Sequence, residues 1–582
     1  MLKRLLRWML RIVVMFVVLV LIVAVSHYIS HRYRPGSVLV LELDGPLAER
    51  GGYPVFGVLN KGGTSLNIIR QALKEAETDS RIAGLAIRVI DPEMELAQAQ
   101  ELSDAITEFG SHGKWTTAYM ETAGESGHGN LPYLVASSAD EVSMMPQGEL
   151  NILGVGIREM FARGMLDWLH VTPNFASLGK YKSAANVFTE KDFTPAQREE
   201  DQALVSDMFN QIVEATARHR HLSADTVREL IDRAPLTAAD GLKSHLLDRL
   251  EYQDQFDDRV KHYKGTEHEL IDYDKYSNPQ VKSPFGARNK IAVIYGVGAI
   301  ERGASGYDPI FSPGSSSMGS DEMTAAFKDA REDDDVRAVV FRIDSPGGSV
   351  IASELIRRAV ELCAKKKPVV VSMSGFAASG GFWVATPAAR VYADPGTLTG
   401  SIGVLGGKFN VSGAAGALGV ASGAITLGKN AEMYDSFTDF TPAQQQIFRD
   451  QILGDTYQYF LKLVAAQRHL TVEQVNDVAQ GRVWSGEQAV KLKLIDQIGG
   501  FDAAMNEAKR LAKLDPKEPV EIVELPGRPG LLERLLSGHI YGQQGLEWPL
   551  PQALAPLLWM IRQSASPHGI LGQAYCPLVP VI

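Results

Sequence analysis

Two long stretches of this chain repeat one another, and this duplication limits the possible folds more than any other feature. Residues 71–89 (QALKEAETDSRIAGLAIRV) resemble residues 325–343 (AAFKDAREDDDVRAVVFRI), and residues 133–155 resemble residues 382–404 at an offset of 249. The period is far longer than that of solenoid or propeller arrays. The sequence therefore predicts two tandem copies of one domain of about 240 residues, a size within the usual range for domains.

Each copy alternates segments of strand character with segments of helix character. Apolar, β-branched runs open the copies at residues 38–43 and 290–295, and amphipathic helix patterns follow them. This alternation predicts an α/β fold with mainly parallel sheets in both copies. We place the first copy at residues 36–280 and the second at residues 285–524, and residues 525–582 form a C-terminal extension with no counterpart.

The N-terminus carries a candidate membrane segment. Residues 12–25 form an unbroken run of 14 apolar side chains, which extends to 21 residues between positions 8 and 28. About 20 residues span a bilayer, so residues 1–34 are expected to form a cytoplasmic stub and a transmembrane anchor that contacts lipid through residues 8–28. Four basic residues precede the run and two follow it, which predicts a cytoplasmic N-terminus and an external body. A cleavable signal peptide is the alternative, although no Ala-x-Ala site follows the run.

Charge and cysteine content exclude several classes of protein. The net charge of −11 argues against nucleic acid as a partner. Two cysteines, Cys363 and Cys576, cannot make a disulfide framework, although one bridge between them stays open. The sequence holds no cluster of histidine, cysteine and aspartate with the spacing of metal ligands, so no metal or other cofactor is expected.

The clearest difference between the copies lies in a small-residue segment of the second copy. Residues 374–381 (SGFAASGG) stand between a strand pattern and an apolar helix pattern. A serine at such a junction places its Oγ at a helix N-terminus, where free N–H groups favour developing negative charge. Ser379 is thus a candidate nucleophile, and the first copy has Asn130 in its place. A packing turn rich in glycine and serine is the structural alternative.

Glycines beside a second buried strand pattern are candidate oxyanion donors. The second copy reads DSPGGS at residues 344–349, whereas the first copy reads IDPEM at residues 90–94 and lacks the glycine pair. An oxyanion hole needs two N–H donors about 3 Å from one oxygen. We expect the amide of Gly380 and one amide of the pair Gly347 and Gly348 to provide them.

A lysine of the first copy is the candidate base. A serine nucleophile needs a base, and no histidine occurs between His268 and His469. Lys182 falls opposite Ala431 of the second copy, so the first copy keeps the lysine and lacks the serine, and the second shows the reverse. A lysine acts as a base only when neutral, so its pKa of about 10.4 must fall by about 3 units at a cost of about 4 kcal/mol. Burial between the copies can supply the desolvation, and Ser401 is a candidate to orient the ammonium, a turn serine being the alternative.

These features together resemble the signal peptide peptidase A (protease IV) family in its long, two-copy form. The resemblance covers about residues 1–525 and includes the segments YKSA at residues 181–184 and AASGG at residues 377–381. It implies a Clp-protease/crotonase-like fold for each copy and a serine endopeptidase with a Ser/Lys dyad, in which Ser379 is the nucleophile and Lys182 the general base. It also implies a homotetramer at the bacterial inner membrane, with the active site in the periplasm. The implied substrates are cleaved signal peptides and other apolar, extended peptides.

Two other functions stay open at this point. A crotonase-type acyl-CoA enzyme would use the glycine amides on a thioester oxygen, and a non-catalytic membrane scaffold would use both copies for assembly. The anchor, the Ser379 junction and the difference between Lys182 and Ala431 favour the peptidase over both. Because one linker joins the copies, we expect Ser379 and Lys182 to meet within one chain.

Overall fold

The computed structural model describes most of the two copies. It covers residues 33–50, 64–125, 127–276, 289–305, 317–515, 520–527 and 573–575. The expected anchor at residues 8–28 and most of the expected C-terminal extension lie outside these residues, as does Cys576. Within the ranges given, no helix combines the length and the apolar character that a membrane crossing needs.

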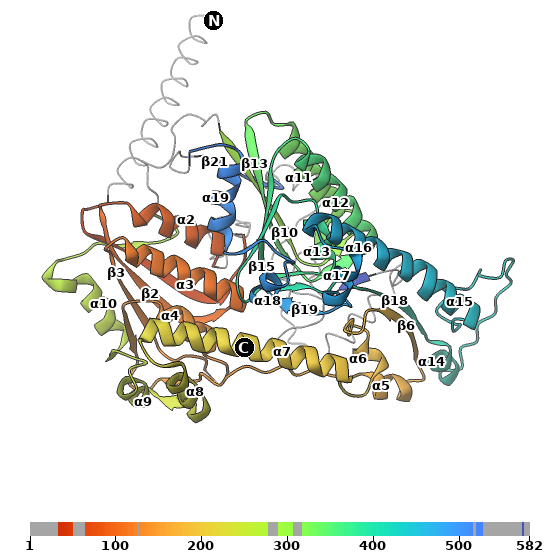
Figure 1. Cartoon of the computed structure of the whole chain (residues 1–582). Helices are drawn as coiled ribbons and strands as arrows, with labels where there is room; N and C mark the ends of the chain where they lie inside the picture. The colour runs from red at the N-terminus through yellow and green to blue at the C-terminus, as the bar shows by residue number, and fades with distance from the viewer. Residues whose placement is uncertain are drawn as a thin grey trace, which may run out of the picture.

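The first copy forms a six-stranded parallel sheet with helices on both faces (Figure 1). In sheet order its strands are β8 (Arg249–Leu250), β4 (Glu141–Met144), β3 (Trp115–Met120), β2 (Ile82–Glu93), β1 (Ser37–Pro46) and β9 (Leu270–Asp272). Its helices are α2 (Leu66–Glu77), α3 (Leu96–Ser111), α4 (Asn130–Ser137), α5 (Arg163–Trp168), α6 (Asn186–Thr189), α7 (Pro195–Arg220), α8 (Ala224–Arg233), α9 (Ala238–Lys243), α10 (Gln253–Lys261) and the 3₁₀ turn η1 (Tyr263–Gly265). Strands β5 (Glu149–Leu150) and β7 (Leu236–Thr237) pair with each other. Strand β6 (Thr172–Leu178) belongs to the first copy in sequence but pairs in a sheet with strands of the second copy.

The second copy repeats this plan around a larger sheet. Its main path is β19 (Val483–Ser485), β17 (Leu398–Gly400), β15 (Val369–Ala378), β13 (Val336–Ser345), β10 (Lys290–Val297) and β21 (Glu521–Leu525), with β16 (Arg390–Ala393) joining β15 to β20 (Gln497–Ile498). Every pair in this sheet is parallel except that of β17 with β19. Its helices are α11 (Ser320–Glu332), α12 (Val350–Ala364), α13 (Gly380–Ala385), α14 (Ser412–Ala417), α15 (Pro442–Gln446), the π-helix η2 (Ile447–Leu453), α16 (Gly454–Arg468), α17 (Val472–Val478), α18 (Gly486–Lys491) and α19 (Phe501–Leu511).

The central strands are buried on both faces, which explains their nearly continuous apolar sequences. Alternate residues of a strand face opposite sides of the sheet. In β10, Ile294 packs in the cluster that contains Phe327 of α11, whereas Val293 packs in the cluster that contains Phe501 of α19. The prediction of an α/β fold with two copies and mainly parallel sheets is therefore confirmed.

A third sheet joins the two copies. Its strand order is β12 (Met318–Gly319), β11 (Ile300–Glu301), β14 (Gly347–Ser349), β22 (Gln573–Tyr575), β18 (Val404–Asn410) and β6. Strand β6 comes from the first copy and runs antiparallel to β18 of the second. Because β6 pairs with β18, the residues that directly follow β6 in the sequence lie against the second copy.

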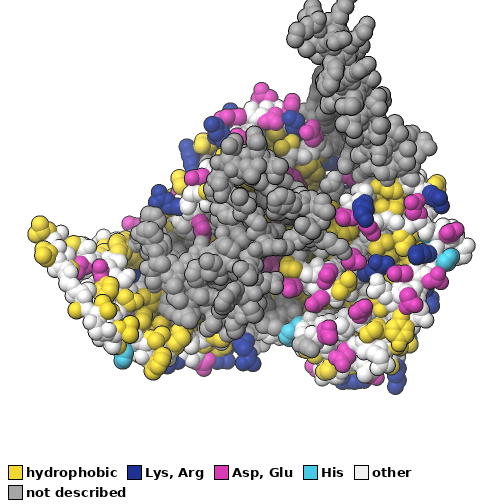
Figure 2. Space-filling view, turned by 180° about the vertical axis from the view of Figure 1, so that it is seen from behind, with side chains coloured by type: hydrophobic (Ala, Val, Ile, Leu, Met, Phe, Trp, Pro, Cys, Tyr) yellow, Lys and Arg dark blue, Asp and Glu magenta, His cyan; other side chains and the backbone are white. Residues whose placement is uncertain are grey.

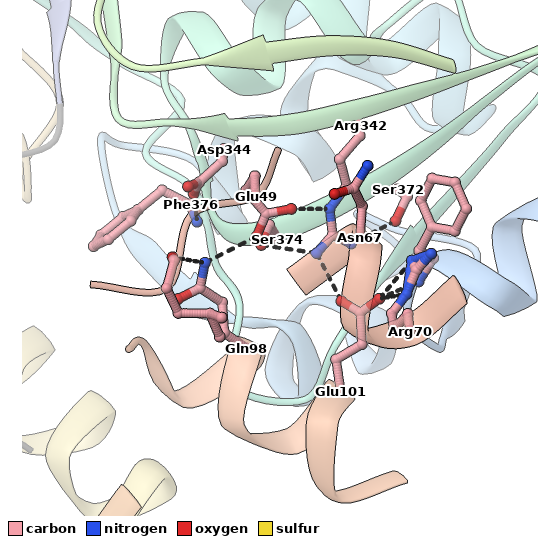
Figure 3. Close-up of polar contacts among 12 residues, drawn as sticks. Glu49, Asn67, Arg70, Gln98, Glu101, Arg342, Asp344, Ser372, Ser374 and Phe376 are labelled. Atoms are coloured by element: carbon pink, nitrogen blue, oxygen red, sulfur yellow. Dashed lines mark hydrogen bonds and ion pairs between the residues drawn. The ribbon is translucent and has the colours of Figure 1, made fainter. Parts of the chain in front are cut away.

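A buried ion network holds the sheets of the two copies together (Figure 3). The guanidinium of Arg342 on β13 lies 2.7 Å from Glu49 and 2.6 Å from Glu101, both from the first copy. It also donates hydrogen bonds to the hydroxyls of Ser372 and Ser374 on β15, at 2.8 and 2.9 Å. Arg342, Glu49 and Glu101 are all buried, so each charge depends on its partners rather than on water.

Candidate active site

Ser379 occupies a strained turn between β15 and helix α13. Its backbone has φ 55° and ψ −111°, a conformation that a residue with a side chain adopts only under constraint. Its N–H donates to the carbonyl of Gly400 at 2.9 Å, which ties the turn to the neighbouring strand β17. Strained strand-to-helix turns of this kind present serine nucleophiles in other hydrolases. The side chain is fully buried in the chain as described.

Lys182 of the first copy reaches this serine. It follows β6, so the pairing of β6 with β18 carries it onto the second copy. Its Nζ lies 2.7 Å from Ser379 Oγ, 2.9 Å from Ser401 Oγ and 3.1 Å from the carbonyl oxygen of Ser401. Lys182 is 3% exposed and Ser401 is 2% exposed. The structure thus brings Ser379, Lys182 and Ser401 together within one chain and away from water.

A segment of the second copy, residues 480–482, supports both sides of this contact. The carbonyl of Gln480 accepts the N–H of Tyr181 at 2.8 Å, and the carbonyl of Arg482 accepts the N–H of Ser401 at 2.7 Å. Between them, Gly481 has φ +79°, and a Cβ at this position would lie 2.6 Å from the Cβ of Lys182. The sequence analysis missed this segment, because no local pattern shows that position 481 packs against position 182.

The candidate oxyanion donors lie close to Ser379. Gly380 is the first residue of α13, so its N–H has no carbonyl partner within the helix. A Cβ on Gly380 would lie 3.1 Å from the amide nitrogen of Gly348, which shows how closely the two backbones approach. The N–H of Gly347 donates to Ser345 Oγ at 3.2 Å. Of the two candidates, Gly347 therefore already has an acceptor for its N–H.

Two buried carboxyl groups lie on α7, and the first of them, Glu200, is close enough to Lys182 to interact with its charge. Burial raises the pKa of Glu200 to about 8, although an N–H from Val483 and the charges of Arg482 and Lys182 lower it. Burial likewise raises the pKa of Asp201 to about 7. Glu200 is therefore largely protonated at neutral pH and adds little negative charge near the amine, whereas Asp201 is about half ionised. No sequence pattern predicted their burial, since acids on a long helix usually face water.

An extended segment occupies the slot beside the candidate oxyanion donors. Strand β22 runs antiparallel to β14, with Gly348 opposite Ala574, and antiparallel to β18, with Leu405 opposite Gln573. The edges of β14 and β18 thus accept an extended backbone between them by main-chain hydrogen bonds. This is the way in which many proteins bind peptides as an added strand.

One cluster elsewhere has the residue types of a metal site. Glu77, Glu108 and His112 of the first copy place one potential ligand atom each within 4.8 Å of one another. The ammonium of Lys74 lies 2.8 Å from Glu77 and already neutralises that carboxylate. We assign no metal to this cluster, since exposed acidic groups commonly gather without one.

A serine hydroxyl on a strained turn, 2.7 Å from a buried amine, defines the site as that of a serine hydrolase. The model of peptidase family S49 matches residues 108–267 and 361–515, and the chain belongs to this family. It is 32% identical to Protease 4 of Salmonella typhi over 467 residues, which are 77% of this chain and 72% of the relative. It is 28% identical to the chloroplastic serine protease SPPA of Arabidopsis thaliana over 518 residues, which are 88% of this chain and 74% of the relative.

A third relative, Protease 4 of Haemophilus influenzae, is 30% identical over 456 residues, which are 76% of this chain and 72% of the relative. These findings confirm the resemblance that the sequence suggested. The protein is a serine protease, and the acyl-CoA enzyme and the non-catalytic scaffold are set aside.

Proposed function

We propose that Ser379 and Lys182 form the catalytic dyad of a membrane-anchored endopeptidase that degrades cleaved signal peptides and other apolar, extended peptides. The observation that carries the proposal is the distance of 2.7 Å between Lys182 Nζ and Ser379 Oγ, from opposite copies of one chain, with both side chains buried. A surface lysine would be charged and unable to accept a proton at neutral pH. Burial removes the water that stabilises the ammonium and so favours the neutral amine.

The proposed reaction is acyl transfer in two halves. Neutral Lys182 accepts the proton of Ser379 Oγ, and the oxygen attacks the carbonyl carbon of the scissile peptide bond. The amides of Gly380 and Gly348 stabilise the resulting oxyanion. The protonated Lys182 then gives its proton to the leaving amine, and the acyl group stays on Ser379. A water molecule, deprotonated by Lys182, attacks the acyl carbon, the bond to Ser379 Oγ breaks, and the acid product leaves. The protonated Lys182 returns its proton to Ser379 Oγ, which restores the enzyme.

The contacts of Lys182 suit the neutral form that this mechanism needs. A neutral amine has two N–H donors and one lone pair. The two oxygens of Ser401 can accept the two N–H groups, at 2.9 and 3.1 Å. The lone pair then faces the Ser379 hydroxyl. In this proposal Ser401 is a positioning residue, which orients the amine without touching the substrate.

The pairing of β22 with the edges of β14 and β18 supports the proposal that the substrate binds in an extended conformation. A peptide that takes the place of β22 would lie antiparallel to β14 and β18 and would pass the amide of Gly348. Main-chain pairing does not depend on side-chain identity, which suits the degradation of peptides of varied sequence. The apolar character of the substrate rests on the family resemblance. That resemblance also supports the Clp-protease/crotonase-like fold, the homotetramer, the anchor at residues 8–28 and a periplasmic active site.

A comparison of four proteins tests the proposal. The full chain in mild detergent is assayed with an internally quenched apolar peptide, as wild type and as Ser379→Ala, Lys182→Ala and Lys180→Ala. Lys180 is the matched control, because it lies two residues away but is exposed and paired with Glu199. We expect the first two variants to lose at least about 1,000-fold in kcat and Lys180→Ala to keep most of it. Turnover by Ser379→Ala or Lys182→Ala within tenfold of wild type would contradict the proposal.

A further inference from the structure

Strand β15 is irregular just before the turn that carries Ser379. It pairs with β13 as far as Met373, and the pairing resumes at Ala377. Between these two points β13 contributes one residue, Asp344, against three of β15, residues 374–376, so β15 forms a bulge. Its neighbour on the other side also changes here, from β16 to β17. Because bulges next to active sites re-aim side chains, the contacts that hold this bulge bear on the position of the nucleophile.

Carboxyl groups contact the bulge on both sides of its middle residue (Figure 3). The hydroxyl of Ser374 donates a hydrogen bond to Glu49 of the first copy. The N–H of Phe376 donates to the carboxylate of Asp344 on β13, at 3.0 Å. The first and last residues of the bulge are therefore held by side chains in place of regular strand pairing.

A third carboxyl group, that of Glu95 in the first copy, lies against the middle residue, Gly375. A Cβ built on Gly375 would lie 1.1 Å from Glu95 Oε2 and 2.3 Å from its Cδ. Only a glycine leaves room for this carboxyl group. Glu95 directly precedes helix α3, and the side chain of Gln98 accepts its N–H at 3.1 Å. The start of α3 thus fixes the group that packs on the bulge.

The atom that contacts the bulge makes no hydrogen bond that would account for its place. Glu95 Oε2 is buried and has no hydrogen-bond partner in the part of the chain that the structure describes. On the surface, by contrast, acidic and basic side chains lie intermixed and in contact with solvent (Figure 2). Burial, together with the charges of Asp344 and Glu49, raises the pKa of Glu95 well above its ordinary value, against the charge of Arg342. The neutral carboxyl group is thereby favoured, and its contribution at this position is the space that it fills.

We propose that Glu95 is a positioning residue for Ser379, whose carboxyl group fills the space over Gly375 and keeps residues 374–376 in the bulge. Strained backbone angles such as those of Ser379 persist only where the surroundings over-determine them. The N–H of Ser379, bonded to the carbonyl of Gly400, holds the turn on one side, and the bulge holds the strand that leads into it. The inference rests on the proposed role of Ser379 as the nucleophile.

The origin of Glu95 in the first copy gives this contact a further consequence. The base Lys182 already comes from the first copy, and Glu95 makes the geometry of the nucleophile depend on that copy as well. A chain in which the two copies are not docked would therefore lack the base and would also release the turn of Ser379. Docking of the copies and assembly of the site are thus one event.

Steady-state kinetics of the full chain in mild detergent test the role of Glu95, with an internally quenched apolar peptide as substrate. We expect Glu95→Ala to lower kcat about 10–100-fold with KM within about threefold. Glu95→Gln has the shape of the neutral carboxyl group and should keep kcat within about threefold. Glu93→Ala is the matched control, because Glu93 lies two residues earlier at the end of β2 and is exposed. A wild-type kcat in Glu95→Ala, or a Glu95→Gln variant as impaired as Glu95→Ala, would overturn the proposal.

A pair of substitutions tests whether the space over Gly375 is what matters. Gly375→Ala alone should lower kcat at least about tenfold, since its methyl group and the carboxyl group cannot share one position. In the Glu95→Ala background the nearest remaining atom, the Cβ of residue 95, lies 3.2 Å away, so the methyl group takes the vacated space. The double variant should therefore exceed Gly375→Ala in kcat at least about tenfold. Losses that simply multiply would refute the proposal.

Reaction with a fluorophosphonate separates this inference from the proposed function. Mass spectrometry locates the modified residue and gives its rate in wild type and in Glu95→Ala, and the thermal midpoint of each protein confirms that folded chains are compared. Modification of Ser379 at least about tenfold more slowly in Glu95→Ala supports the positioning role. Modification of Ser379 at equal rates in both proteins refutes this role and leaves the dyad intact. A wild type that is not modified at Ser379 refutes the proposed function itself and the positioning role with it.

Discussion

Replacement of Arg342 by methionine tests how the two copies are held together. The guanidinium is buried between Glu49 and Glu101 of the first copy, at 2.7 and 2.6 Å. Burial alone would raise the pKa of Glu49, but the charge of Arg342 and its hydrogen bond outweigh burial and hold that pKa below its ordinary value. Arg342→Met keeps much of the side-chain volume and leaves the buried carboxylate of Glu49 without its cation, whereas Glu101 keeps its pair with Arg70 at 3.0 Å.

The expected loss follows from the burial of the network. Removal of one partner from a buried ion pair costs about 3–5 kcal/mol. For a cooperative unit of about 200 residues, this lowers the midpoint of thermal unfolding by about 6–20 °C. The loss should also grow with pH. In wild type the lowered pKa of Glu49 stabilises the folded state at pH values above about 4.3, the pKa of this group in the unfolded chain. In the variant an unpaired carboxylate must ionise inside the protein as the pH rises, which destabilises the folded state.

Calorimetry of wild type and two variants measures this effect at about pH 5 and about pH 8. Arg358→Met is the matched control, because Arg358 pairs with Glu361 on the same copy but is half exposed, and exposed pairs contribute at most about 1 kcal/mol. Adding Glu49→Gln to Arg342→Met should restore most of the loss, because Glu101 keeps Arg70 as its partner. The reasoning fails if Arg342→Met unfolds within 2 °C of Arg358→Met, or if its deficit is the same at both pH values.

Three further predictions concern the site and its surroundings. Burial raises the pKa of Asp344 to about 7, so its contribution to stability is full below about pH 4 and is lost as the pH rises through about 7. Asp344→Asn should remove this loss of stability with rising pH. Midpoints of guanidinium unfolding that fall with pH equally in the variant and in wild type would contradict this prediction. Ser401→Ala removes one acceptor of the Lys182 amine, and we expect kcat to fall about 10–100-fold with KM within about threefold; an unchanged kcat would refute the positioning role. Gly481→Ala should lower kcat at least about tenfold more than Gly113→Ala, because both glycines have φ near +80° but a Cβ at 113 would meet nothing within 4 Å. Equal kcat values for these two variants would show that contact at position 481 does not position the lysine.

Much of the fold could be predicted from the sequence because each copy repeats the same local patterns. The strand patterns expected at residues 38–43 and 290–295 lie within β1 (Ser37–Pro46) and β10 (Lys290–Val297). The repeated hexapeptide DFTPAQ also keeps one structural role in both copies. Its threonine caps a helix that begins with proline, at Thr194 and again at Thr441.

The candidate site was predicted from the differences between the copies, and the contacts that surround it were not. Arg88 and Arg342 occupy equivalent positions, yet Arg88 pairs with Asp257 of its own copy near the surface, whereas Arg342 is buried between the copies. Equivalent sequence cannot reveal this difference, because the environment depends on how the copies dock. The hydrogen bond from Gly347 to Ser345 was equally hidden, since it depends on the turn geometry of the folded chain.

The central claim is that a neutral Lys182 activates Ser379, and the pH dependence of acylation tests it most directly. The full chain is reacted with a fluorophosphonate, and mass spectrometry follows the modification of Ser379 over time. Because Glu200 has a pKa of about 8 and titrates in the same range, Glu200→Gln is measured beside Lys182→Ala. The account predicts that the wild-type rate rises with pH through an inflection well below 10.4, that the inflection persists in Glu200→Gln, and that Lys182→Ala reacts at least about 100-fold more slowly without it. A Lys182→Ala variant that acylates at the wild-type rate, or that keeps the inflection, would contradict the account.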